Sequence, residues 1–82
     1  MYYMYLLRNK ISKEIYYGYT ADLERRSKEH NVDNEWELIY YEAYLSEKDA
    51  RRREVKLKDY GQSRAHLKNR LKDSLGSKIS AG

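Results

Sequence analysis

The side chains with the clearest chemical potential are ionisable residues at positions where a helix normally turns an apolar residue inward. Arg26 and His30 are four residues apart in a charged segment with a helical pattern, so they lie on one helical face. Glu54 stands between Ala50 and Leu57 on the inward stripe of a later helix. Because burying an unpartnered charge is costly, each of these side chains must face a partner or a ligand.

Arg26 and Glu54 allow two interpretations on spacing alone. The structural one is a buried Arg26–Glu54 ion pair that holds two helices together. The functional one is a shared pocket, in which the arginine binds a phosphate and the carboxylate binds a divalent metal ion. Taken alone, His30 is most simply a helix C-terminal residue favoured by the dipole. Gly18 is most simply a strand-end glycine that relieves a tight turn.

Tyrosine is the unusual feature of the composition, with ten tyrosines and no phenylalanine. Tyrosine suits half-buried strand positions, because its ring packs while its hydroxyl reaches water or a partner. Taken alone, Tyr5 and Tyr16 are therefore sheet packing residues. We expect one or two of the ten to take part in chemistry.

The apolar patterns predict an α+β fold, a small three-stranded antiparallel sheet flanked by three helices in the order ββαβαα. The first strand is apolar on both alternating faces, which is typical of a central strand. The predicted strands cover residues 2–8, 15–19 and 36–44, and the predicted helices cover 21–30, 47–60 and 62–75.

Capping residues define the expected helix ends. Thr20 is the expected N-cap of the first helix, and Ser46 with Asp49 forms a capping-box-like start for the second. Gly61 is the expected stop of the second helix. A polar loop is expected over 31–34.

Length and composition predict a single domain over residues 1–75, followed by a flexible tail over 76–82. The chain has no cysteine, which is compatible with the cytoplasmic location that we expect. No apolar run approaches the roughly twenty residues of a membrane span. The apolar start of the chain is predicted to be a strand rather than a leader.

Charge is distributed unevenly along the chain, although its net value is only +4. Residues 1–45 hold six Lys/Arg and eight Asp/Glu, whereas residues 46–82 hold eleven and five. A basic C-terminal part favours a polyanionic partner such as nucleic acid. The alternative is an ordinary solvated helical surface.

Together these residues resemble the GIY-YIG nuclease family. The first signature falls at Tyr3-Met4-Tyr5 and the second at Tyr16-Tyr17-Gly18. Arg26 and His30 match the arginine and histidine of the family, and Glu54 matches its metal-binding glutamate.

The resemblance covers residues 2–75 and is closest to short single-domain members related to the nuclease domain of the excision-repair endonuclease. Some positions depart from the family pattern. Tyr3 replaces the first glycine of the namesake motif, Met4 replaces its isoleucine, and Tyr17 replaces the isoleucine of the second motif. Asn69 is the candidate for a further polar residue that many members carry late in the domain.

The resemblance implies hydrolysis of a phosphodiester bond with one divalent metal ion. Glu54 would hold Mg²⁺ or Mn²⁺, and Arg26 would pair with the scissile phosphate. Tyr5 would act as general base or orient the attacking water, with nearby cations lowering its pKa from about 10. Tyr16 would complete the tyrosine pair, and His30 would polarise a tyrosine or contact phosphate.

The resemblance also implies a DNA substrate and a role in repair or recombination. Gly18 would leave room for the substrate to approach. The expected backbone contacts are basic side chains of both helices, namely Arg25, Arg52, Arg53 and Lys56. The leading hypothesis is a metal-dependent endonuclease. The alternatives are a non-catalytic nucleic-acid-binding module on the same scaffold and a protein-interaction domain.

Overall fold

A computed structural model describes residues 1–30 and 35–75, without the side chain of His30. The elements follow in the order β1 (Tyr2–Asn9), β2 (Ile15–Thr20), α1 (Leu23–His30), β3 (Trp36–Tyr44), α2 (Glu47–Asp59) and α3 (Gly61–Arg70). This order confirms the predicted ββαβαα arrangement. The loop predicted over 31–34 and the tail predicted over 76–82 lie outside the described residues.

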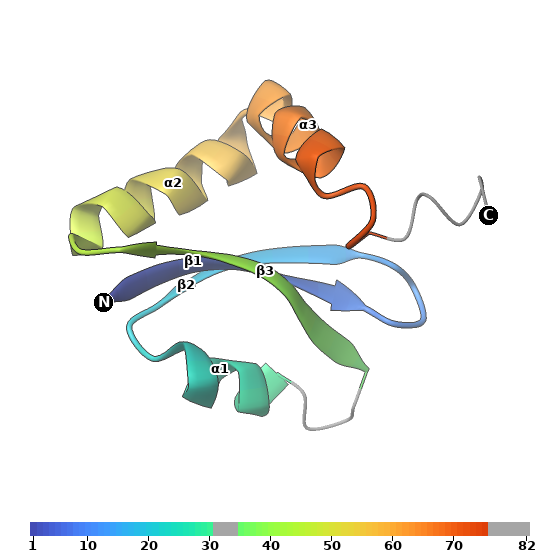
Figure 1. Cartoon of the computed structure of the whole chain (residues 1–82), viewed down its shortest axis with the longest axis horizontal. Coiled ribbons are helices and arrows are strands. Elements are labelled where there is room, and N and C mark those ends of the chain that lie inside the picture. The colour runs from blue at the N-terminus through green and yellow to red at the C-terminus, as the bar shows by residue number, and fades with distance from the viewer. Residues whose placement is uncertain (31–34, 76–82) are drawn as a thin grey trace.

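The sheet has the strand order β2-β1-β3, and both pairings are antiparallel. The α+β prediction and the central place of β1 are therefore confirmed. Figure 1 shows α2 and α3 on one face of the sheet and α1 on the other. No helix within the described residues is long and apolar enough to span a membrane.

The main core lies between the sheet and the two C-terminal helices. Met4 and Leu6 of β1 pack with Leu57 of α2 and Leu67 of α3, and none of the four is more than 1% exposed. Met4 and Leu6 are two residues apart, so they share one face of β1. This face of the strand thus anchors both helices.

The opposite face of β1 buries Tyr5 and Leu7. Its cover is α1, an eight-residue helix with Leu23 as its apolar residue. So short and charged a helix covers only part of a three-stranded sheet. Tyr16 of β2 and Tyr41 of β3 accordingly remain exposed.

Two of the expected helix ends are wrong. Asp22, not Thr20, caps α1, because the Asp22 carboxylate accepts a hydrogen bond from the backbone N–H of Arg25 at 3.1 Å. Gly61 begins α3 instead of ending α2, which stops at Tyr60 in an extended conformation. Ser46 does precede α2 as expected, but its side chain makes no capping hydrogen bond.

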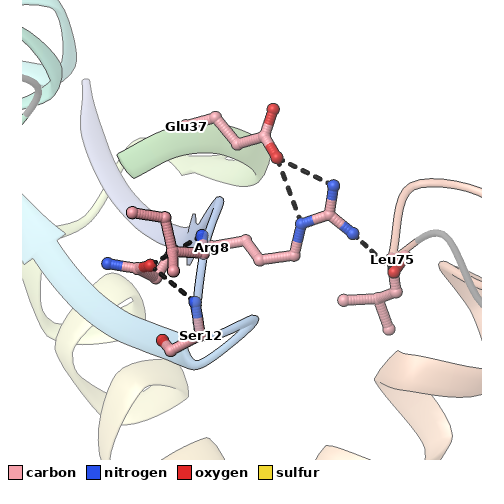
Figure 2. Close-up of polar contacts among 6 residues, drawn as sticks. Arg8, Ser12, Glu37 and Leu75 are labelled. Atoms are coloured by element: carbon pink, nitrogen blue, oxygen red, sulfur yellow. Dashed lines mark hydrogen bonds and ion pairs between the residues drawn. The ribbon is translucent and has the colours of Figure 1, made fainter. Parts of the chain in front are cut away.

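The turn between β1 and β2 has the predicted hairpin length. The Asn9 side chain oxygen accepts hydrogen bonds from the backbone N–H groups of Ile11 and Ser12, each at 2.9 Å (Figure 2). Lys13 adopts a positive φ of 68°. A buried asparagine therefore closes the hairpin by replacing missing backbone partners.

The third helix ends at Arg70, earlier than predicted, and the chain then turns back toward the sheet. Arg8 of β1 donates to the Leu75 carbonyl at 2.5 Å and forms an ion pair with Glu37 of β3 at 2.8 Å (Figure 2). One guanidinium thus holds the end of the described chain against two strands.

Replacing Leu57 by alanine should lower the free energy of unfolding by about 2–5 kcal/mol, because it opens a cavity between the sheet and α2. Urea unfolding measures the change. Val55→Ala is the control on the same helix, where the side chain is 52% exposed, and it should change stability by less than about 1 kcal/mol. Equal effects of the two substitutions would contradict this placement of the core.

Candidate active site

Tyr5 and Gly18 lie opposite each other in the β1–β2 ladder. The Tyr5 ring covers the glycine so closely that a Cβ at position 18 would lie 2.5 Å from the Tyr5 hydroxyl oxygen. Tyr16 lies two residues before Gly18, and its ring centroid is 6.2 Å from that of Tyr5. The open space expected beside Gly18 for the substrate is therefore filled by Tyr5, and the glycine seats the ring.

Arg26 approaches this tyrosine pair from α1, since its charge acts on the Tyr5 hydroxyl. Its Nε is buried and finds no acceptor among the described residues. One terminal nitrogen lies 3.6 Å from the Glu29 carboxylate, and the side chain is 41% exposed. A buried donor without an acceptor is uncommon in proteins, and it leaves this guanidinium available to an external anion.

Glu54 approaches the tyrosine pair from α2, on the other side of the sheet. Its carboxylate oxygen Oε2 lies 2.9 Å from the Lys58 ammonium, which in turn lies 5.9 Å from the centroid of the Tyr16 ring. The Glu54 charge also raises the pKa of Tyr5. Side chains from both faces therefore meet at β2, the edge strand.

The alternative of a buried Arg26–Glu54 ion pair is wrong. Arg26 pairs with Glu29, and Glu54 pairs with Lys58. The two side chains are 41% and 20% exposed, so neither is sealed in the core. The functional interpretation of Arg26 and Glu54 keeps its structural basis.

Lys58 is the site residue that sequence analysis missed. In the sequence it is one of several basic residues on its helix, and nothing in its type sets it apart. The available signal was its spacing of four residues from Glu54, which places the two side chains on one face of α2.

Burial raises the pKa of the Tyr5 hydroxyl to about 12, and the charge of Tyr16 raises it further. Arg26 lowers this pKa but does not offset the other effects. The expectation of a lowered pKa is therefore wrong for the protein alone. At neutral pH, Tyr5 is a phenol that can donate a hydrogen bond.

A second charged cluster, on the β3 flank of α2, is structural. Glu42 accepts hydrogen bonds from Tyr40, Tyr44 and Arg53. Burial alone would raise the pKa of Glu42, but these hydrogen bonds outweigh it and lower the pKa. Arg53 is thus committed to Glu42, and its predicted role in holding DNA is wrong.

Two further predicted phosphate contacts lie on this same flank of α2. Arg52 and Lys56 line a groove of about 230 Å³ with Tyr44. The flank toward β2 carries other residues, because Arg51 lies 4.8 Å from the ring centroid of Tyr19, and Lys58 lies near Tyr16. Arg52 and Lys56 therefore do not surround Glu54.

The remaining predicted residues are placed as follows. Arg25 is exposed on α1, 3.9 Å from Glu29. His30 ends α1, and its side chain lies outside the described part of the chain. Asn69 is exposed on α3.

The donor atoms at the site fit a hydrated divalent ion better than a caged one. Within residues 1–30 and 35–75, no three His, Cys, Asp or Glu side chains gather as a metal cage. Glu54 offers one partly exposed carboxylate. Mg²⁺ is commonly held by one or two carboxylates, with water and substrate phosphate as its other ligands. Glu54 therefore fits such an ion.

The largest hollow described in the structure lies elsewhere. A groove of about 600 Å³ between α1 and β3 is lined by residues that include Tyr3, Leu23, Leu38 and Tyr41, and by none of the four site residues. The four instead gather at the sheet edge, outside any comparable hollow. Such a surface suits a polymer lying across it better than a small molecule held in a cavity.

The contact between Tyr5 and Gly18 can be tested with a double-mutant cycle. Gly18→Ala should lower the free energy of unfolding by about 1–3 kcal/mol, because the added methyl group collides with the Tyr5 ring. In a Tyr5→Val background the ring is gone, so the same substitution should be nearly neutral. Chemical denaturation of the four proteins measures the coupling. Additive effects would contradict the proposed seat for the ring.

Comparison with known proteins adds one match. The family model of the GIY-YIG catalytic domain matches residues 1–72 of the 82-residue chain. No curated protein and no solved structure matches the chain. The matched segment contains all the residues that converge at the edge of the sheet, namely Tyr5, Tyr16, Arg26, Glu54 and Lys58. The chain belongs to the family of GIY-YIG catalytic domains, which is a nuclease-type family.

Proposed function

We propose that the protein is a metal-dependent endonuclease that hydrolyses phosphodiester bonds in DNA. The observation that supports this most strongly is the convergence of Tyr5, Tyr16, Arg26 and Glu54 at the β2 edge. Arg26 and Glu54 approach the same tyrosine pair without pairing with each other. A cation and a carboxylate kept apart in this way suit the two charges of a metal-bound phosphate.

Each residue has a distinct part in the proposed reaction. Arg26 pairs with the scissile phosphate and offsets the charge that develops on it. Tyr5, as a neutral phenol, donates a hydrogen bond that orients the attacking water or the phosphate, and Tyr16 holds the Tyr5 ring. Glu54 holds Mg²⁺ or Mn²⁺, and the bound ion supplies stabilisation of the leaving oxygen.

The proposal extends to substrate and setting. Because the site is open and lies at an edge of the sheet, branched or damaged DNA with irregular shape could reach it as readily as a regular duplex. We therefore include a role in repair or recombination, carried out in the cytoplasm and with delivery by a partner protein.

A second candidate is a non-catalytic nucleic-acid-binding module. Two observations favour it, the ion pair that already neutralises Glu54 and the raised pKa of Tyr5. This candidate predicts DNA binding that weakens with salt, without cleavage under any metal condition.

Glu54→Gln should reduce cleavage of plasmid and branched DNA at least about 100-fold, because it removes the carboxylate that would hold the metal ion. DNA affinity, measured by fluorescence anisotropy, should change by only a few fold. Glu47→Gln is the matched control, since Glu47 lies on the same helix and contacts Tyr19 instead of the site. Cleavage by Glu54→Gln at the wild-type rate would refute the assigned role. Absence of cleavage by the folded wild-type protein would favour the binding module.

The raised pKa of Tyr5 leads to an expectation for the pH dependence. Because this hydroxyl ionises only near pH 12, its ionised fraction below about pH 9 is negligible. Tyr5→Phe should therefore slow single-turnover cleavage by a similar factor, about 10-fold to 100-fold, at every pH between about 6 and 9. If instead the ratio of wild-type to variant rates rises about tenfold per pH unit, Tyr5 acts as an ionised general base.

A further inference from the structure

The Glu54–Lys58 ion pair sits inside the candidate site, in contrast to the Asp49–Arg52 pair on the other flank of the helix. Lys58 Nζ lies 2.9 Å from Glu54 Oε2, and the side chains are 48% and 20% exposed. The same ammonium lies 5.9 Å from the Tyr16 ring centroid. Lys58 therefore touches both the carboxylate assigned to the metal and the tyrosine pair.

A divalent ion and the Lys58 ammonium would both need the Glu54 carboxylate. An ion bound directly to that carboxylate would lie within a few ångströms of the ammonium if Lys58 stayed in place. The repulsion between charges of +2 and +1 at about 4 Å weakens binding more than tenfold, even at the dielectric constant of water. Lys58 must therefore leave the carboxylate oxygen when the metal ion binds.

The released ammonium has a second partner within reach. Arg26 approaches the tyrosine pair at Tyr5, and Lys58 approaches it at Tyr16. A phosphate seated on the two rings would thus meet one cation from α1 and another from α2. The flexible four-carbon stem of lysine permits the small movement from carboxylate to phosphate.

We propose that Lys58 is a positioning residue that exchanges partners. It neutralises Glu54 in the absence of metal, competes with the divalent ion for that carboxylate, and binds a substrate phosphate once released. This inference rests on the proposed function, because it takes Glu54 as the metal-binding residue. It adds a counter-ion that links metal binding to DNA binding.

The first test measures Mn²⁺ affinity by electron paramagnetic resonance, without DNA and without reference to activity. Lys58→Met should bind Mn²⁺ about tenfold more tightly than the wild type, because the competing cation is gone. Lys56→Met is the matched control, with the same change in net charge on the other flank of α2. It should change the Mn²⁺ affinity by less than about twofold. Thermal unfolding confirms that each variant is folded.

The second test measures DNA affinity with and without Ca²⁺, which also binds through oxygen ligands. Lys58→Met should weaken DNA binding about threefold to tenfold when Ca²⁺ is present and much less when it is absent. Lys56→Met should have the same effect in both conditions. This difference is expected because a metal-free Glu54 retains Lys58, so its ammonium is unavailable to DNA.

The outcomes separate this inference from the proposed function. If Lys58→Met binds Mn²⁺ no more tightly than Lys56→Met, the exchange is overturned. If Glu54→Gln binds Mn²⁺ as well as the wild type does, the metal role of Glu54 is refuted and the exchange falls with it. If Glu54→Gln loses Mn²⁺ while Lys58→Met gains no affinity, only the exchange fails.

Discussion

The structure depends on the burial of β1 on both of its faces. Met4 and Leu6 on one face receive α2 and α3, whereas Tyr5 and Leu7 on the other face are buried beside α1. Both edges of the strand are hydrogen-bonded, to β2 and to β3. A side chain on such a strand has little freedom to move. The tyrosine at the centre of the site is therefore fixed by the most constrained element of the fold.

The position of the site follows from this layered arrangement. Arg26 and Glu54 belong to helices on opposite faces, so their side chains can meet only at an edge of the sheet. That edge is β2, where Gly18 admits the Tyr5 ring and Tyr16 extends the aromatic surface. The two charges then reach one place without neutralising each other, which is the property that the proposed chemistry requires.

The same helix shows how structural and functional charges differ. Glu42 accepts hydrogen bonds from Tyr40, Tyr44 and Arg53, and this network fastens α2 to β3. On the other flank, Glu54 has one lysine as its ion-pair partner and stays partly exposed. A carboxylate with several fixed donors contributes to specificity of the fold. A carboxylate with one exchangeable partner can still receive a ligand.

The sequence by itself determined the order of the elements, the central place of β1, and the choice of Tyr5, Tyr16, Arg26 and Glu54. Strand alternation, helical spacing and motif residues are local signals, so they can be recognised without the folded chain. Only the tertiary structure decided that Arg53 binds Glu42, that Lys58 binds Glu54, and that burial raises the pKa of Tyr5 to about 12. The rotation of α2 against the sheet selects which basic residues face the site. The pKa depends on desolvation by segments distant in the chain. These properties arise from packing between elements, and no local pattern records them.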